Sequence, residues 1–189
     1  MKFLSLIFAM YVAAVQLQAQ TWTEEQIRAA NTADTISSLT EEERDVFLYL
    51  NLARMYPKDF VKFELSGGQV KDNYLLSLQQ KLRSQRPLNP VHWNAEMQAL
   101  ATCYSAEQSR RGTIGHQRKD CTEGFNAECV SYGMNGGRDI VLQLLIDRGV
   151  PDYGHRKICL LGNIRYLGVS ANEHPKNLRC CVLDFSFTE

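Results

Sequence analysis

Helix-forming patterns come first along this chain and strand-forming patterns come last, and this order limits the folds open to it. Between residues 40 and 149, apolar residues recur three and four positions apart in several segments, which is the spacing of an amphipathic helix. Segments 167–169 and 181–187 are instead rich in residues that favour strands, and residues 172–177 should form the turn between two antiparallel strands. Helices followed by strands predict an α+β layer fold.

The size and charge of the chain limit the number of domains and the kinds of partner. The chain has 189 residues, of which 44% are hydrophobic and 22% are charged. This is enough for the core of one ordinary domain. Because 21 basic residues balance 21 acidic ones, the charge excess typical of nucleic-acid or anionic-membrane binding is missing. We therefore expect one domain and no nucleic-acid partner.

The N-terminus has the pattern of an export signal. Lys2 precedes an uncharged stretch over residues 3–15, and Ala19 places a small residue before an expected cut ahead of Gln20. The apolar run is shorter than the ~20 residues that cross a bilayer, so no transmembrane anchor is expected. Residues 1–19 are thus a predicted signal peptide, and the mature protein is expected to be secreted or periplasmic. Residues 20–39, which are polar and show little periodicity, should form a lead-in to a domain over residues 40–189.

Capping residues and helix breakers predict where the helices begin and end. Thr40 and Glu43 form a capping box, so a helix should begin there and end before Pro57. Pro57 can open a short second helix that residues 66–68 break. Further helices are expected over residues 74–82, 94–112 and 140–149, with Gly149 as the C-terminal cap of the last one.

Six cysteines remain in the chain after signal cleavage, and all lie in its second half, at positions 103, 121, 129, 159, 180 and 181. An even number in an exported chain predicts disulfides, and we expect at least two. Cys180 and Cys181 should point to opposite faces of a strand and so have different partners, or one of them should stay free. Zinc is a poor alternative use because the chain has no Cys-x-x-Cys pair.

Two of the four histidines stand in similar short phrases, Gly115-His116 and Gly154-His155, with Glu128 and Asp147 between them. Two imidazoles and two carboxylates in one cavity could hold a divalent ion, with the acids orienting a bound water. The same set could work as a general acid and base without metal. Ion pairs with nearby arginines would equally explain the two acids; the candidates are Arg118, Arg148 and Arg156.

The order of several motifs resembles the CAP domain of cysteine-rich secretory, venom-antigen and pathogenesis-related proteins, with the bacterial-type branch the most similar. The resemblance covers roughly residues 43 to 187. Its motifs are Leu50-Asn51-Leu52-Ala53-Arg54, Pro87 to Trp93, Gly115-His116, Glu128, Leu144 to Asp147, Gly154-His155-Arg156-Lys157-Ile158 and Leu167-Gly168-Val169.

This resemblance implies a single α-β-α sandwich with helices flanking a small antiparallel sheet, and a central cleft lined by His116, Glu128, Asp147 and His155. Metal ligation, by Zn²⁺ or another divalent ion, is expected from His116, His155 and Glu128, with Glu128 nearer to the histidines than any other acid and Asp147 on the opposite wall. Residues 64–86 lie beside the cleft as a probable insertion.

Three functions follow from these residues as hypotheses. The first is a secreted binding module whose cleft holds a metal ion and a peptide, glycan or lipid ligand. The second is a zinc-assisted hydrolase, peptidase-like, in which Glu128 activates water. The third is a cysteine hydrolase that pairs a free thiol with His155, and it requires an exposed thiolate. Of these we favour the binding module over an enzyme.

Overall fold

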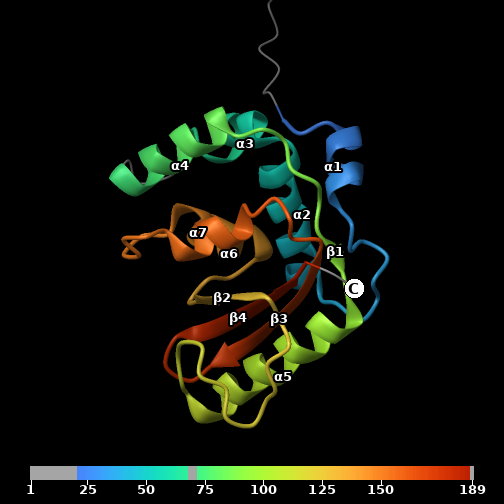
Figure 1. Cartoon of the computed structure of the whole chain (residues 1–189), viewed down its shortest axis with the longest axis vertical. Helices are drawn as coiled ribbons and strands as arrows, with labels where there is room; N and C mark the ends of the chain where they lie inside the picture. The colour runs from blue at the N-terminus through green and yellow to red at the C-terminus, as the bar shows by residue number, and fades with distance from the viewer. Residues whose placement is uncertain (1–20, 68–71, 188–189) are drawn as a thin grey trace, which may run out of the picture.

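A computed structural model describes residues 21–67 and 72–187 of the chain. The predicted signal peptide, residues 1–19, lies outside these residues. Figure 1 shows a small sheet with helices on both sides. The helices within the described residues are α1 (Glu24–Ala30), α2 (Glu41–Met55), α3 (Pro57–Glu64), α4 (Asn73–Ser84), α5 (Ala95–Arg111), α6 (Gly137–Ile146) and α7 (Gly154–Cys159). None of them is long and apolar enough to cross a membrane.

The sheet has four strands in the order β1-β3-β4-β2: β1 (His92–Trp93), β2 (Ala127–Tyr132), β3 (Tyr166–His174) and β4 (Leu178–Ser186). The pairs β3–β4 and β2–β4 are antiparallel. The two-residue strand β1 pairs with β3 in parallel, so the sheet is not antiparallel throughout. Because β2 pairs on one side only, it forms an edge of the sheet.

The fold is the predicted α+β sandwich, because each face of the sheet is covered by a different set of helices. Helix α5 packs on β3 and β4 from one side, while α2, α6 and α7 contact the sheet from the other. Successive side chains of β4 point alternately to the two helical layers. Val182 belongs to the small core beneath α5, whereas Cys181 and Leu183 belong to the larger core beneath α2 and α6.

Two residues of the Leu50–Arg54 motif hold distant segments together rather than forming part of a cleft. The Asn51 amide donates to the carbonyl oxygens of Ala30 and Val91 and accepts from the Val91 amide. The buried Arg54 guanidinium donates to the carbonyl oxygens of Cys159 and Leu161, at 2.7 and 3.0 Å. Burial lowers the pKa of Arg54 to about 10. These hydrogen bonds anchor α2 to the end of α7.

Local signals located several helix ends correctly. The capping box of Thr40 and Glu43 begins α2, Pro57 is the first residue of α3, and Gly112 caps α5 in the left-handed conformation. The predicted cap at Gly149 is wrong, since α6 ends at Ile146 and Asp147 is its left-handed cap. The cause is tertiary: Asp147 turns out of the helix to place its carboxylate against α7.

The expected lead-in contains a helix that its weak periodicity did not indicate. Thr23 and Gln26 form a capping box at the start of α1. Just before it, the Trp22 indole donates to Glu64 and packs edge-on against Phe63, with ring centroids 4.9 Å apart. Contacts with α2 and α3 therefore stabilise a helix of seven residues that is too short to be stable by itself.

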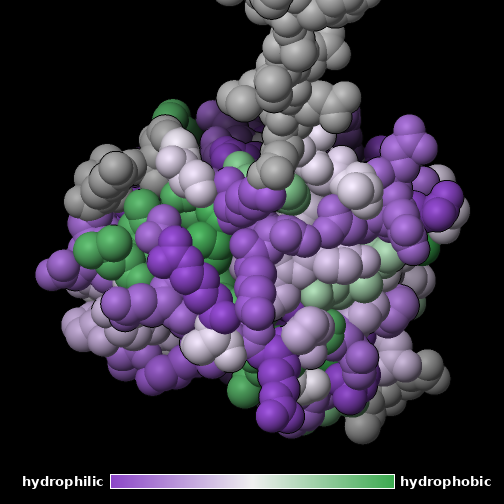
Figure 2. Space-filling model, turned by 90° about the horizontal axis from the view of Figure 1, so that it is seen from above, coloured by the Kyte–Doolittle hydropathy of each residue, from purple (hydrophilic) through white to green (hydrophobic). Residues whose placement is uncertain are grey.

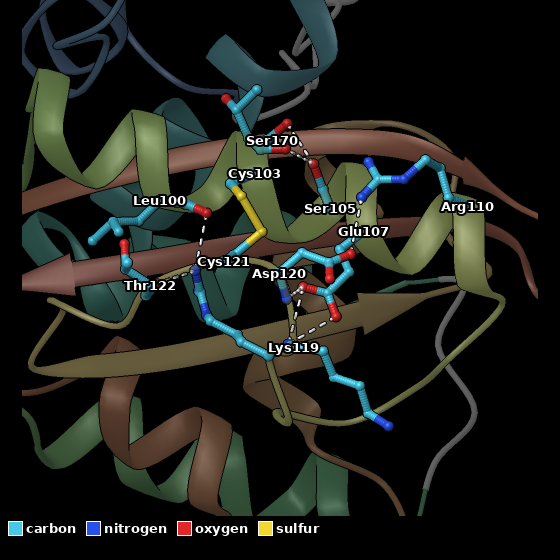
Figure 3. Close-up of a disulfide and its surroundings, with 12 residues drawn as sticks. Leu100, Cys103, Ser105, Glu107, Arg110, Lys119, Asp120, Cys121, Thr122 and Ser170 are labelled. Carbon is cyan, nitrogen blue, oxygen red and sulfur yellow. Dashed lines mark hydrogen bonds and ion pairs between the residues drawn. A yellow bond between two sulfur atoms is a disulfide. The ribbon is translucent and has the colours of Figure 1, made fainter.

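The described residues include all six cysteines and contain one disulfide, Cys103–Cys121, so the expectation of at least two is wrong. It joins α5 to the loop before β2 (Figure 3). The other four cysteines are free and buried, at positions 129, 159, 180 and 181. Cys180 and Cys181 do point to opposite faces, because the Cys180 thiol donates to the Ser105 carbonyl of α5 while Cys181 lies in the opposite core.

Counting the free thiols should distinguish one disulfide from the two or more that the sequence predicted. We expect Ellman's reagent to react with none of the thiols rapidly in the native protein and with four after denaturation without reductant. The thiolate is the reactive form, and burial raises the pKa of Cys181 and Cys129 well above the usual value. Six thiols in the denatured chain would contradict the single disulfide, and two would indicate a second one.

Candidate functional site

The two histidines of the Gly-His phrases face each other. The ring centroids of His116 and His155 are 6.4 Å apart, with 37° between the ring planes. His116 lies on the loop between α5 and β2, whereas His155 is the second residue of α7. The His116 side chain is 55% exposed and that of His155 is 25% exposed, so both rings are accessible to a ligand.

Each histidine is held by its own buried carboxylate. The Nδ1 atom of His116 lies 2.7 Å from Glu128 Oε1, and Nδ1 of His155 lies 2.7 Å from Asp147 Oδ1. An ionised carboxylate can only accept, so in each pair Nδ1 is the donor. The ring geometry then leaves Nε2 directed away from the acid. The expectation that Glu128 is nearer to the histidines than any other acid is wrong, because Asp147 lies equally close to its own histidine.

The two pairs come from opposite layers of the sandwich and meet at the edge strand β2. Glu128 is opposite Asp184 in the β2–β4 ladder, and Val130, two residues on, belongs to the core beneath α5. Cys129, which lies between Glu128 and Val130, faces the other layer, where its thiol donates to the His155 carbonyl at 3.8 Å. A strand whose alternate residues face the two layers brings both pairs together.

Backbone conformation positions the α6–α7 half of the site. Asp147 has a φ of 60° and Tyr153 a φ of 54°, both in the left-handed region that non-glycine residues seldom adopt. The Asp147 carboxylate receives the backbone N–H of Arg156 through its second oxygen. The Tyr153 ring stacks on the Arg156 guanidinium at 4.1 Å. These contacts stabilise the two turns that flank His155.

The other half contains a buried arginine, Arg118, which the sequence named as one of three possible ion-pair partners of the acids, and the structure confirms its pair with Glu128. Arg118 donates to Glu128 through Nη2, and the same nitrogen lies 2.7 Å from Asp184 Oδ2. The guanidinium is packed between the Tyr104 and Phe125 rings, 4.5 Å from each centroid. One signal was available in the sequence, since Asp184 is the one charged residue in the run 180–185, which is otherwise apolar.

The loop that carries His116 and Arg118 is tied down on both sides of them. The Gly115 carbonyl accepts hydrogen bonds from Tyr104 and Gln108. Further along, the buried Glu107 carboxylate accepts the backbone N–H groups of Lys119 and Asp120. The Cys103–Cys121 disulfide lies beside these contacts (Figure 3). His116 is thus presented by a rigid loop.

Arg118, Glu128 and Asp184 form a buried cluster in which one guanidinium contacts two carboxylates. Burial raises the pKa of Asp184 to about 7, against the opposing effect of Arg118. The hydrogen bond to Glu128 raises the pKa of His116. The two shifts have different main causes, but in each case the folded protein holds the proton more tightly than the free side chain does.

The Asp184 shift predicts a pH effect on stability. The folded state retains the Asp184 proton up to a pH of about 7, whereas the unfolded chain releases it near 3.8. The folded state therefore binds more protons between these values, so this contribution to stability is fully present below about 4 and is lost as the pH rises to about 7. Asp184→Asn, which cannot ionise, should gain stability relative to wild type across that window. Urea unfolding in EDTA over the same range measures the difference, and a pH-independent difference would contradict the shift.

The buried cysteines argue against a thiol nucleophile. Cys129 is the free cysteine whose thiol contacts the His155 backbone, but it does not contact the imidazole. Burial raises its pKa well above the usual value, with a further increase from Cys159. A thiol in this environment stays protonated and is a poor nucleophile. The cysteine-hydrolase hypothesis therefore finds no reactive thiolate at the site.

A known protein family matches the part of the chain that carries this site. The model of the CAP family, the cysteine-rich secretory protein family, matches residues 76–185. This chain belongs to the CAP family. The matched residues run from within α4 to within β4 and include both histidines and both acids of the site. No curated protein matches the sequence.

Proposed function

We propose that this CAP-family chain is an exported binding module that holds a divalent metal ion, with zinc as the first candidate, between His116 and His155. The observation that carries the proposal is the pair of opposed histidine–carboxylate dyads. Metal-ligating histidines characteristically donate their second ring nitrogen to a carboxylate, which fixes the tautomer and orients the ring. Both histidines of this site have such a partner, at 2.7 Å in each case.

The separation of the rings is at the upper limit for a shared ion. Zn–N bonds are about 2.0–2.1 Å long, so two imidazoles on one ion have centroids at most roughly 6.4 Å apart. The observed centroid distance is 6.4 Å, and a tetrahedral ion would draw the two rings closer together. The charge of the cluster also favours a cation. Arg118 offsets only one of the two buried carboxylates that it contacts, Glu128 and Asp184.

In this proposal Glu128 orients His116 and is not itself a metal ligand, which differs from the ligand set expected from the sequence. Its Oε1 is occupied by His116 and its Oε2 by Arg118. Within residues 21–67 and 72–187, no group of three His, Cys, Asp or Glu side chains has the geometry to hold a metal. Water or the donor atom of a ligand would complete the coordination.

This arrangement favours a binding module over the zinc-assisted hydrolase. A catalytic zinc normally has three protein ligands and a nearby base that activates water. Glu128, the expected base, is fully engaged, and Asp147 accepts from both His155 and the Arg156 backbone. We infer that the ion, held between the two accessible rings, binds a peptide, glycan or lipid ligand outside the cytoplasm, as the predicted signal peptide implies.

Calorimetry with zinc near pH 7.5 tests the proposal. Replacing both histidines, His116→Ala with His155→Ala, should abolish binding and leave the circular dichroism spectrum unchanged. His92→Ala is the matched control, since His92 is exposed on β1 and outside the site. Binding to the wild-type chain should weaken at pH 5, because imidazole must be neutral to bind a metal.

Two outcomes would reject the proposal. Full zinc affinity in the double variant would place the ion elsewhere. Native mass spectrometry of the exported chain, purified without chelators or a metal-affinity tag, should reveal bound metal. A chain without metal that also fails to take up added zinc would leave the dyads without this role.

A further inference from the structure

Helix α4, which lies in the probable insertion over residues 64–86, supplies one wall of a groove. Helix α4, within this segment, lies beside α7 (Figure 1). Between the two helices is a groove of about 540 Å³. Ser77 and Lys81 line it from α4, and the other wall is made by α7 and its flanking residues, from Tyr153 to Leu161. This volume is within the range of small-molecule sites.

The groove is lined by cations without a carboxylate among them. Lys81, Arg156 and Lys157 line it, and none of the lining residues is acidic. Arg156 is buried, and its guanidinium donates only to neutral oxygens: Oγ of Ser77 and the carbonyls of Leu145, Ile146 and Tyr74. A buried cation whose guanidinium contacts no carboxylate favours an anion in its neighbourhood.

The acids near the groove do not cancel this charge. Lys157 Nζ lies 4.0 Å from Asp152, and these side chains are 66% and 71% exposed, so solvent weakens their attraction. Asp147 is bound to the Arg156 backbone and to His155, on the side of α7 that faces the metal site.

The rest of the lining is apolar. Leu160, Leu161 and the Tyr153 ring complete the groove, and the Leu161 side chain is 36% exposed. On α4, Leu76 is 51% exposed. Seen from the end of the molecule where α3 and α4 lie, hydrophobic residues gather on the α4 side while hydrophilic residues cover most of the remainder (Figure 2).

We propose that the groove between α4 and α7 binds a small amphiphilic anion, a molecule with a carboxylate, sulfonate or sulfate head and an apolar body. The head pairs with Lys81 and Lys157, and the body packs on Tyr153, Leu160 and Leu161. This site names a ligand class for the binding module proposed above, but it requires no metal. His155 and the groove residues share α7, so the two sites are neighbours on one short helix.

Two related fluorescent probes test the charge requirement. 1-Anilinonaphthalene-8-sulfonate carries a sulfonate, and N-phenyl-1-naphthylamine has the same apolar body without it. We expect the sulfonate to bind the full exported chain roughly tenfold more tightly than the amine, the value of two partly exposed ion pairs. Its affinity should fall with increasing salt, because exposed charges are screened.

Substitutions of the lining residues test whether the probes bind in this groove. Lys81→Glu with Lys157→Glu should weaken sulfonate binding at least tenfold and leave the amine unaffected, while Lys62→Glu on α3 is the matched control outside the groove. Leu161→Ser should weaken both probes. If the double variant does not retain the wild-type circular dichroism spectrum, Lys157→Gln and Leu161→Ser serve as the test, with selective loss of the sulfonate and loss of both probes as the expected results.

Equal affinity for the two probes, or unchanged sulfonate binding in the lysine variants, would overturn the proposal. Each titration is repeated in EDTA and in the chain carrying His116→Ala and His155→Ala, where sulfonate affinity should be unchanged. Loss of sulfonate binding in EDTA or in the double-histidine variant would assign the probe to the proposed metal site and reject a separate groove. Failure of the wild-type chain to bind zinc, with sulfonate binding retained, would reject the metal proposal and leave this one standing.

Discussion

Replacing Gly168 by alanine should lower the free energy of unfolding by about 3 kcal/mol, at the upper end of the range for overpacked sites. A Cβ atom at this position would lie 2.1 Å from the Met97 carbonyl carbon and 2.2 Å from the Gln98 nitrogen. Both are backbone atoms of α5, so no side-chain rotation can relieve the overlap. Helix α5 would have to move away from β3, which would also break the hydrogen bonds between the Gln98 side chain and the Val169 backbone.

Urea unfolding of Gly168→Ala measures this loss. Gly67→Ala is the control, because a Cβ atom there would meet nothing within 4 Å. Its stability should stay within about 0.5 kcal/mol of wild type, as for ordinary surface substitutions. Equal stability of the two variants would show that α5 and β3 are not in such close contact.

The second large effect is expected from Arg118→Met, which should destabilise the fold by about 3–5 kcal/mol, the cost of leaving a buried ion pair without one partner. Glu128 and Asp184 both lose the guanidinium, and their side chains are 3% and 0% exposed. Packing between Tyr104 and Phe125 is largely preserved by the methionine, so most of the loss comes from charge.

Two further variants separate charge from packing. Adding Asp184→Asn to Arg118→Met should restore part of the stability, because one of the unpaired carboxylates is then gone. Arg110→Met is the exposed control: Arg110 pairs with Asp120 at 3.4 Å, its side chain is 61% exposed, and such pairs contribute about 0–1 kcal/mol. A loss in Arg118→Met no larger than in Arg110→Met would contradict the buried cluster.

The buried arginine cluster also explains why this half of the candidate site is rigid. Arg118 connects the loop of His116 to β2 through Glu128 and to β4 through Asp184, and it donates to the Leu100 carbonyl of α5 at 3.0 Å. His116 is therefore oriented by a network that spans three elements. The His155 half depends instead on local turns at Asp147 and Tyr153.

The helices were predictable where neighbouring residues determine them. Thr40 with Glu43 and Pro57 act on residues within one helical turn, so their effect can be seen in the sequence alone. Helix α7 has six residues and no side-chain cap, and β2 is an edge strand of six residues. Both depend on contacts with distant elements, which left no local signal strong enough to predict them.

Motif order indicated that His116, Glu128, Asp147 and His155 would lie together, and the structure brings them together as two pairs. Motif order did not indicate which acid pairs with which histidine. Which acid holds which histidine depends on the conformation of Asp147 and on the side of β2 to which Glu128 points, and both depend on packing against other elements.

The sequence by itself determined the α+β class and the ends of several helices, because capping and periodicity are properties of short segments, and the order of its motifs indicated the four residues of the candidate site. Tertiary structure alone decided that Asp184 joins the site, that Arg118 is the arginine that pairs with Glu128, that Cys103 pairs with Cys121, and that α4 forms a groove with α7. Each of these contacts joins segments from different elements. Their proximity is set by how the helices pack on the sheet, and no local pattern records it.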